Sequence, residues 1–355
     1  MPLSEYNLII SAANTDNKRA VIHISTFFGR SDASGRSIRY GRHMDTTINA
    51  LEQYPTIAQP DNTHGNAHAP TLYETLAQQR QQMMERCSRL AANSNEQVAF
   101  CMTTALALLE IPPPSCPTIS NDVLHTVSTT TNDRIGRYDG GVQPHVWRFA
   151  SDDPQAFVQI NRSILALHPS HVWAQMSAQL SLEELIVLGD AIVANAKRRY
   201  VYRPLTKYVR RISGFNGRRR CLKALTYMRS RVGSPMESRL RISINRHGVP
   251  LPATGYEVPG EFFDSGVPMT LDIAWPQYKV AIEYDGDHHR TDKQQWRRDQ
   301  YKRERIRSRG WIVIIATAGN LGSESRQAEF AFLVARYLMQ RGAQFTFFPC
   351  AQDLK

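Results

Sequence analysis

Three carboxylates in the C-terminal third of the chain have a spacing that could bind a metal ion. Asp272 lies on one predicted strand, and Glu283 and Asp285 lie on the next. The two strands would meet in a turn at Gln277 and Tyr278. In the antiparallel register set by that turn, Asp272 faces Glu283, and directly opposed side chains share one face of the sheet. The hairpin therefore predicts a pair of neighbouring carboxylates.

The third carboxylate would join this pair because strand side chains alternate between the two faces of a sheet. Glu283 and Asp285 are two residues apart, so both would point to the same face. Val280, Ile282 and Tyr284 would point to the opposite face and into the core. Three carboxylates on one face repel one another unless a cation neutralises them, and hard divalent cations prefer carboxylate oxygens. We therefore expect Asp272, Glu283 and Asp285 to bind Mg²⁺ or Mn²⁺.

A simpler interpretation of the same carboxylates stays open. An acidic strand face can be exposed to solvent and can pair with arginines of the same protein. Glu237 also has two interpretations. Ser234, Pro235 and Glu237 are typical of the start of a helix, where Glu237 would complete a capping box. Glu237 could instead support catalysis from that helix.

Two histidines follow the glycine turn after Asp285. His288 and His289 could be ordinary loop residues. One of them could also act as a general base, or could bind the metal-bound water or the scissile phosphate, because histidine titrates near neutral pH. We include both among the candidate catalytic residues.

A basic helix is predicted at 292–309, directly after the carboxylates. It carries eight lysines and arginines against three acidic residues. Trp296, Tyr301 and Ile306 are expected on its buried side. It could be a solvated amphipathic helix. Alternatively it could lie along a nucleic-acid backbone beside the metal site, where the cations would hold phosphates. The residues predicted to bind nucleic acid on this helix are Arg297, Arg298 and Lys302.

A second basic stretch lies in the middle of the chain. No Asp or Glu occurs between Asp190 and Glu237, whereas thirteen lysines and arginines lie from Lys197 to Arg231. A helix is expected near its end. The stretch could be a solvated connector, or it could bind phosphates without sequence specificity. The residues predicted to bind nucleic acid here are Arg218, Arg219 and Arg220.

Composition limits the function classes. The 355 residues carry 43 Lys and Arg against 32 Asp and Glu, a formal net charge of +11. This surplus favours a polyanionic partner. The five cysteines are widely spaced without a CxxC pair, which argues against a structural zinc site and a disulfide framework. No signal peptide or membrane-length apolar segment is evident. We expect a cytoplasmic protein that binds DNA and no membrane.

The predicted elements indicate an α/β protein. Residues 1–70 have no clear structure apart from a strand at 21–28. Residues 71–200 should form a small α+β domain that begins with helices at 71–93 and 95–111. Residues 201–232 should form the basic connector. Residues 233–345 should form a mixed sheet flanked by helices, in the order α-β-β-β-α-β-α.

The C-terminal part resembles a known family. The strings SPMESRLR, LDIAWPQYKVAIEYDGDHHR and WRRDQYKRERIRSRGW, within 233–320, are similar to the very-short-patch-repair-like (Vsr-like) endonuclease domains of the PD-(D/E)XK superfamily. The resemblance implies a restriction-endonuclease-like fold and a magnesium-dependent deoxyribonuclease. It matches the early helix glutamate to Glu237, the metal-binding aspartate to Asp272 and the second carboxylate to Glu283. Asp285 stands where the superfamily often has a lysine.

The middle of the chain has a weaker resemblance. Residues from about 95 to 200, with the strings TTALALLEIPPP and HVWAQMSAQLSLEELIVLGDAI, are similar to AbiEi-type antitoxin or regulator domains. This resemblance implies a DNA-binding or partner-regulating module. Two hypotheses follow for the whole chain. The first is a metal-dependent DNA endonuclease in repair or in defence against foreign DNA. The second is a non-catalytic DNA-binding regulator with a degenerate nuclease domain.

Overall fold

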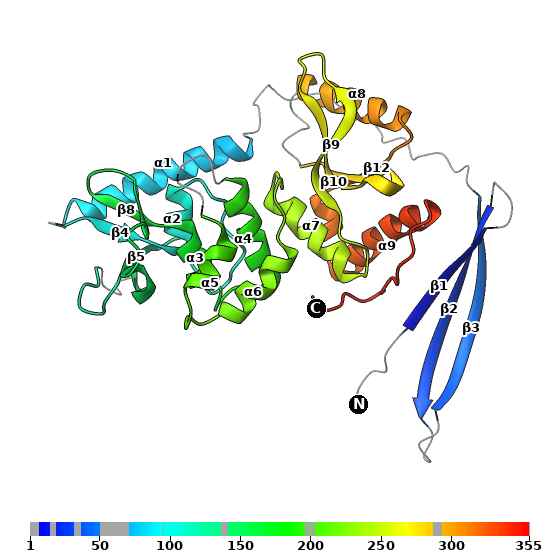
Figure 1. Ribbon diagram of the computed structural model, residues 1–355, viewed down its shortest axis with the longest axis horizontal. Coiled ribbons are helices and arrows are strands. Elements are labelled where there is room, and N and C mark those ends of the chain that lie inside the picture. The colour runs from blue at the N-terminus through cyan, green and yellow to red at the C-terminus, as the bar shows by residue number, and fades with distance from the viewer. Residues whose placement is uncertain are drawn as a thin grey trace. The chain divides into compact units, whose positions relative to one another are not determined.

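The structure is a computed structural model of the whole chain, with an α/β architecture (Figure 1). For residues before 50, and for 293–295, only the backbone is described. The described residues are 7–14, 19–31, 37–49, 71–94, 96–135, 141–195, 200, 203–286 and 293–354. The chain divides into two compact units: Met1–His68 together with Leu240–Lys355, and Ala69–Arg239.

The first strands of the chain form an antiparallel sheet. β1 (Asn7–Asn14), β2 (Arg19–Ser31) and β3 (Ser37–Asn49) pair in the order β1-β2-β3. The strand predicted at 21–28 lies within β2 and is confirmed.

The unit Ala69–Arg239 contains a mixed five-stranded sheet in the order β6-β5-β4-β8-β7. Its strands are β4 (Val98–Phe100), β5 (Leu124–Ser128), β6 (Val142–Val146), β7 (Phe157–Gln159) and β8 (Ile164–Leu167). Its helices are α1 (Leu72–Ala91), α2 (Met102–Leu108), α3 (Pro169–Met176), α4 (Leu182–Ala194), α5 (Leu205–Arg211) and α6 (Arg218–Tyr227), with a 3₁₀ turn at Arg148–Ala150.

Local sequence explains where several of these helices begin. At α1, the Thr71 side chain accepts from the Glu74 backbone N–H and the Glu74 carboxylate accepts from Thr71 N–H. This capping box satisfies N–H groups that have no partner inside the helix. The helix predicted at 95–111 is only partly confirmed. Its beginning forms β4, because Val98 and Phe100 alternate into the core of the sheet.

The basic stretch at 201–232 differs from a connector. Its described residues form α5 and α6 and pack within the unit Ala69–Arg239. Apolar side chains explain the difference, since Tyr208, Val209, Phe215, Cys221 and Ala224 are all buried. The sequence does not reveal this buried face, because most of the residues between these apolar positions are charged or polar.

The C-terminal elements follow the predicted order α-β-β-β-α-β-α, which is confirmed. The helices are α7 (Pro235–Arg246), α8 (Lys293–Ser308) and α9 (Glu324–Gln340). The strands are β9 (Ala253–Phe262), β10 (Pro268–Trp275), β11 (Val280–Tyr284) and β12 (Ile312–Ala316), in the sheet order β12-β11-β10-β9. Short 3₁₀ turns lie at Pro276–Tyr278 and Ala318–Leu321.

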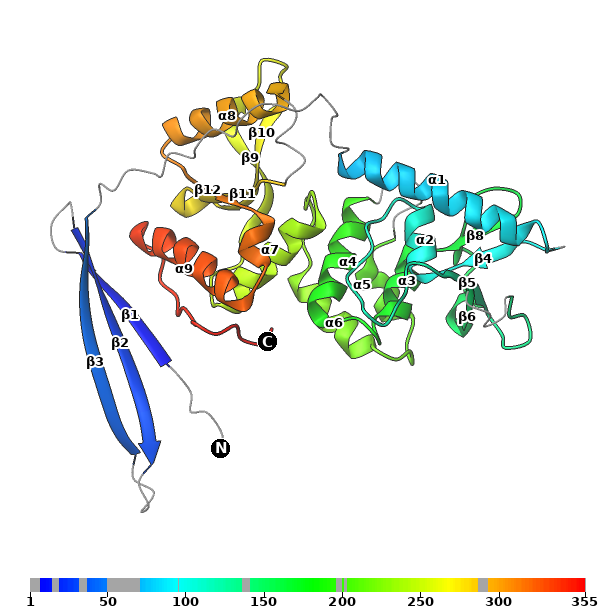
Figure 2. The same ribbon diagram turned by 180° about the vertical axis from the view of Figure 1, so that it is seen from behind.

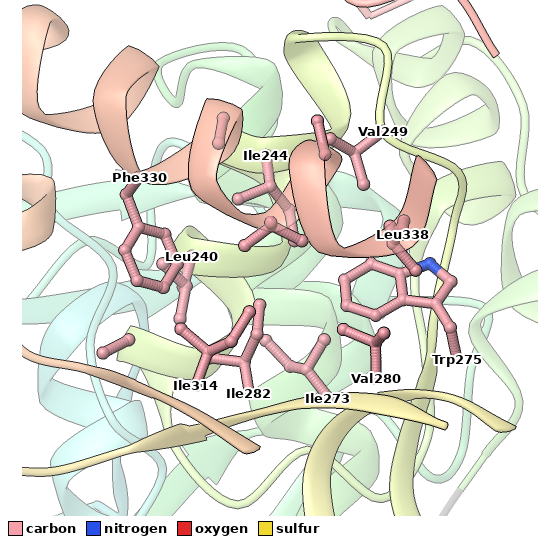
Figure 3. Packing of buried hydrophobic residues seen from close by; sticks show 14 of the residues in the cluster. Leu240, Ile244, Val249, Ile273, Trp275, Val280, Ile282, Ile314, Phe330 and Leu338 are labelled. Atoms are coloured by element: carbon pink, nitrogen blue, oxygen red, sulfur yellow. The ribbon is translucent and has the colours of Figure 1, made fainter. Parts of the chain in front are cut away.

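This sheet is mixed and has helices on both faces. β9, β10 and β11 are antiparallel, and β12 joins β11 in parallel after the α8 crossover. α8 covers one face, whereas α7 and α9 cover the other (Figures 1 and 2). The main core lies on the α7 and α9 face, where strand side chains meet helix side chains (Figure 3). Its labelled members are Leu240, Ile244, Val249, Ile273, Trp275, Val280, Ile282, Ile314, Phe330 and Leu338.

Candidate functional site

The register of β10 and β11 is the predicted one. Ile273 pairs with Ile282, and Trp275 pairs with Val280. The turn between the strands contains Lys279 in the left-handed region, at φ 51°. The register brings Asp272 beside the end of β11, where its Oδ2 accepts the Tyr284 backbone N–H at 2.9 Å. This hydrogen bond fixes the orientation of the Asp272 carboxylate.

The two faces of β11 differ as the alternation predicts. Val280 and Ile282 lie in the core beneath α7 and α9, and Tyr284 packs against that core. The opposite face, which carries Glu283, is also covered. A second apolar cluster there includes Ala281 and Ile306 of α8. Glu283 is therefore buried, with 6% of its surface exposed.

Glu283 is paired with a cation from α8. Its Oε1 lies 2.6 Å from Lys302 Nζ, and both side chains are largely buried. Burial raises the pKa of Glu283 to about 7; the Lys302 ammonium opposes this shift and the charge of Asp272 adds to it. Asp272 and Glu283 are thus electrostatically coupled neighbours. Lys302, predicted to bind nucleic acid, instead faces a carboxylate of its own chain.

Asp285 lies near Arg303, the residue of α8 that follows Lys302. Arg303 Nη2 lies 3.7 Å from Asp285 Oδ2, in a looser ion pair. The Asp285 backbone N–H donates to the Ala316 carbonyl at 2.7 Å, which ties the end of β11 to the end of β12. Two consecutive cations of α8 therefore face the two carboxylates of the β11 end.

Other cations of α8 are also engaged within the protein. Arg305 Nε donates to Glu261 Oε2 at 2.7 Å, and Arg309, just past the helix, binds the other oxygen of Glu261. Hydrogen bonds and charge from Arg305 and Arg309 lower the pKa of Glu261, although burial opposes the shift. Arg297 and Arg298 are exposed, and the Arg298 guanidinium lies over the Phe263 ring, 4.2 Å from its centroid.

The predicted buried side of α8 is largely wrong. Ile306 is fully buried, whereas Trp296 is 54% exposed and Tyr301 is 44% exposed. The reason is that the underside of α8 is largely charged. It presents Lys302 and Arg303 to the carboxylates, which apolar periodicity cannot reveal.

Glu237 caps its helix. Its backbone N–H donates to Ser234 Oγ at 3.2 Å, and its Oε2 accepts the Gly233 N–H at 2.8 Å. The Ser234 half of the predicted capping box is confirmed, whereas the Glu237 carboxylate accepts from Gly233, the residue before the predicted N-cap. Glu237 belongs to the unit Ala69–Arg239, and its role in catalysis stays a prediction. His288 and His289 lie outside the described residues.

The arginines at the start of α6 have different surroundings. Arg220 Nη1 donates to the carbonyls of Ser177 and Leu180 at 2.7 and 2.9 Å. Arg218 Nε donates to the Val209 carbonyl at 3.2 Å. Arg219 is exposed. These contacts bind the guanidinium groups of Arg218 and Arg220 to backbone carbonyls of their own unit, although Arg220 is exposed as a residue, like Arg219.

The candidate ligands are carboxylate oxygens, which are the type of ligand that Mg²⁺ prefers. Within the described residues, no group of three or more His, Cys, Asp or Glu side chains is arranged to hold a metal ion. Asp272 and Glu283 nevertheless lie close enough for their charges to interact, and Asp285 follows Glu283 by two residues. Mg²⁺ is commonly bound by one or two carboxylates, and water and substrate phosphates complete its shell. Asp272 and Glu283 would hold such an ion.

Sequence reasoning missed a buried ionic cluster around Asp153 in the other unit. Both oxygens of Asp153 are bound by the Arg203 guanidinium at 2.7 Å, and Arg211 and His171 bind Oδ2. On its other nitrogen, Nδ1, His171 accepts from Trp147 Nε1 at 3.0 Å. The signal in the sequence was weak, an acidic dipeptide some 50 residues upstream of the arginines that bind it.

These contacts shift two pKa values. Burial would raise the pKa of Asp153, but hydrogen bonds from His171, Gln155 and Arg211 and the charge of Arg203 lower it to about 2. Burial lowers the pKa of His171 to about 4, although Asp153 opposes this shift. His171 is therefore neutral near pH 7 and donates its Nε2–H to Asp153. The cluster joins α3 and α5 to the loop before β7.

Among the described residues, no helix has the length and apolar character needed to cross a membrane. All five cysteines are free thiols.

Comparison with known proteins gives distant relatives. No family model matches the chain, and no solved structure matches it. Two uncharacterized proteins, from two strains of Mycobacterium tuberculosis, are each 24% identical to the chain over 268 residues. The match covers 75% of this chain and 90% of each relative. The chain is therefore similar, along most of its length, to proteins that occur in a mycobacterium.

Proposed function

We propose that this protein is a metal-dependent DNA endonuclease, which hydrolyses phosphodiester bonds in DNA repair or in defence against foreign DNA. The observation that carries the proposal is the coupled pair Asp272 and Glu283. The charges of these two carboxylates repel each other and one of them is buried; Lys302 offsets one negative charge, and a divalent cation would offset both. The resemblance to Vsr-like domains supports the same two residues as ligands of Mg²⁺ or Mn²⁺.

The residues around the pair would have distinct roles. Asp272, oriented by the Tyr284 N–H, would hold the metal ion with Glu283. Asp285 would be a further ligand or would orient a water molecule. His288 or His289 would assist proton transfer. A bound divalent ion would supply Lewis-acid chemistry, that is, activation of water and stabilisation of charge that develops on the phosphate.

DNA would be held by cations that the fold leaves exposed. Arg297 on α8 and Arg219 on α6 are predicted nucleic-acid residues of this kind. Their contacts would bind phosphates and carry no sequence information. We further propose that the protein is cytoplasmic, and that the part resembling AbiEi-type regulators binds DNA or a regulatory protein partner.

A second candidate function is a non-catalytic DNA-binding regulator. The observation that favours it is the pairing of Glu283 with Lys302 and of Asp285 with Arg303. These ion pairs neutralise the carboxylates without a metal ion. The presence of Asp285, where the superfamily often has a lysine, agrees with loss of catalysis.

A plasmid-nicking assay separates the two functions. The wild-type protein is incubated with supercoiled plasmid and Mg²⁺, Mn²⁺ or EDTA, and DNA binding is measured in parallel by fluorescence anisotropy. The endonuclease proposal expects nicking that needs the metal and is lost in Asp272→Asn and Glu283→Gln. Tight binding in EDTA, with no nicking in either metal, would instead support the regulator.

A further inference from the structure

The strongest unexplained feature is that α8 aims a lysine at the carboxylate pair. Lys302 Nζ lies 2.6 Å from Glu283 Oε1, and only 13% of the lysine side chain and 8% of the glutamate side chain are exposed. Lysine heads usually extend into water while their stems cover apolar surface. Here the ammonium lies inside, at the carboxylate that would hold the metal ion.

We propose that Lys302 is an internal competitor of the divalent cation: in the metal-free protein its ammonium occupies Glu283, and a metal ion must displace it. The inference rests on the carboxylate site of the proposed function. It adds a control on that site, because the affinity for the metal ion would depend on how firmly Lys302 is held.

The position of α8 keeps this competitor in place. Ile306, one helical turn after Lys302, is fully buried beneath the helix. Arg305 and Arg309 bind Glu261 of β9 through both carboxylate oxygens. The helix is thus anchored by apolar contact and by an ion-pair cluster. The proposal therefore requires only that the Lys302 side chain rotate away from Glu283, with the helix in place.

Charge explains why lysine and metal ion would exclude each other. A divalent ion at Asp272 and Glu283 would be repelled by an ammonium held within hydrogen-bond distance of the same oxygen. When Lys302 is absent, a buried carboxylate remains beside a second carboxylate, and this is the costly arrangement. The cation then becomes the available source of compensation.

The neighbouring pair should matter less. Arg303 lies 3.7 Å from Asp285, and that carboxylate is more exposed than Glu283. An ion pair at 3.7 Å is weaker than one at 2.6 Å because Coulomb attraction falls with distance, and solvent reaches a quarter of the Asp285 side chain. We therefore expect Lys302, and not Arg303, to dominate the competition.

Calorimetric titration with Mn²⁺ alone tests the proposal on the full-length protein. The variants are Lys302→Met and Lys302→Gln, with Arg307→Met as the matched control. Arg307 is an exposed cation of the same helix that contacts the Val313 carbonyl. We expect both Lys302 variants to bind Mn²⁺ about tenfold more tightly or better. Arg307→Met should keep the wild-type affinity, and Glu283→Gln should lose binding.

Thermal unfolding with and without Mn²⁺ gives a second readout. A ligand that binds only the folded state raises the melting temperature, and the rise grows with its affinity. In EDTA the Lys302 variants should have a lower melting temperature than wild type. Addition of Mn²⁺ should raise their melting temperature more than that of wild type. The Lys302→Gln variant controls for a folding defect that the methionine side chain alone would cause.

The outcomes separate this inference from the proposed function. Unchanged or weaker Mn²⁺ binding in both Lys302 variants overturns it, even if the wild type nicks DNA. Tighter binding by the variants supports it, even if no preparation nicks DNA and the endonuclease proposal fails. Mn²⁺ binding seen in the variants but not in wild type also supports it. Absence of binding in every preparation overturns it.

Discussion

The proton affinity of Glu283 reports most directly on the site. An acid whose pKa is higher in the folded state than in the unfolded state binds its proton more tightly when folded. The folded pKa is about 7, against an ordinary value of 4.5. Between these values the folded protein holds a proton that the unfolded chain has lost. Stability should therefore fall as pH rises through this window.

This gives a prediction for Glu283→Gln. Denaturant unfolding in EDTA, measured at several pH values from 4.5 to 7, should show a downward slope in wild type. The slope should be much smaller in Glu283→Gln, because glutamine does not titrate. Glu304→Gln, an exposed position on α8, is the matched control and should keep the wild-type slope. Equal slopes in all three proteins would contradict a raised pKa of the buried Glu283 carboxyl group.

Asp153 gives the opposite sign in the other unit. Its folded pKa of about 2 lies below the ordinary 3.8, so its stabilising effect is present above 3.8 and is lost as pH falls toward 2. Asp153→Asn leaves Arg203, Arg211 and His171 without their carboxylate. We expect it to lower the free energy of unfolding by about 3 kcal/mol at pH 7 and to flatten the acid limb of stability.

The control for this experiment is Asp152→Asn, at the exposed neighbouring position. It should change stability by less than about 0.5 kcal/mol. If both variants unfold alike, the cluster around Asp153 contributes no more than an ordinary surface residue.

At the residue scale, sequence reasoning identified the carboxylates but not their partners. Asp272 and Glu283 were predictable because a short turn sets the register and alternation sets the face. Lys302, Arg303 and Glu261 were not, since their pairing depends on how α8 lies on the sheet. Helical periodicity predicts which residues lie on one face of a helix, but it does not predict which residues of the sheet that face contacts.

The elements of the C-terminal part were largely predictable. Strand alternation, capping residues and glycine turns gave the order α-β-β-β-α-β-α that the structure has. The buried face of α8 was mistaken, because a helix that packs with charged residues has a weak apolar pattern. For the same reason the stretch that contains α5 is predicted to be a connector, although the helix expected near its end is present as α6.

The docking of α8 should depend on one buried carboxylate of β9. Glu261 is 1% exposed and binds Arg305 and Arg309. In Glu261→Gln both arginines lose an ionised partner, so the free energy of unfolding should fall. Hydrogen exchange should quicken in α8 more than in α9, because only α8 loses an anchor.

Glu257→Gln on the same strand is the control, since Glu257 is exposed. Amide hydrogen exchange in α8 of Glu257→Gln should be as slow as in the wild type. Unchanged exchange in α8 of Glu261→Gln would show that Ile306 and its apolar neighbours hold the helix without the ion pairs.

At the scale of the whole molecule, many of the 43 lysines and arginines that give the net charge of +11 are paired within the protein. Lys302, Arg303, Arg305 and Arg309 neutralise carboxylates of their own chain. The count of 43 lysines and arginines therefore overstates the cations that are available to DNA. The exposed cations outside these ion pairs, and not the basic runs as such, should set the affinity for phosphates.

Salt dependence of DNA binding tests this distinction. Arg219→Gln and Arg297→Gln should each reduce the slope of log affinity against log salt by about 1, because each removes one phosphate contact. Arg220→Gln should leave the slope unchanged and should lower stability, since the Arg220 guanidinium binds two backbone carbonyls. Anisotropy titrations at several salt concentrations, with unfolding curves beside them, measure both effects. Equal slopes for Arg219→Gln and Arg220→Gln would contradict the assignment.

The most direct test of the central claim compares two aspartates in one plasmid-nicking experiment. Asp272→Asn alters the carboxylate pair, whereas Asp264→Asn alters an exposed residue in the turn between β9 and β10. Both proteins, and wild type, are stripped with EDTA and then supplied with Mn²⁺. We expect wild type and Asp264→Asn to nick the plasmid only after Mn²⁺ is restored, and Asp272→Asn to remain inactive. Nicking by Asp272→Asn at the wild-type rate would contradict a catalytic metal site at Asp272 and Glu283.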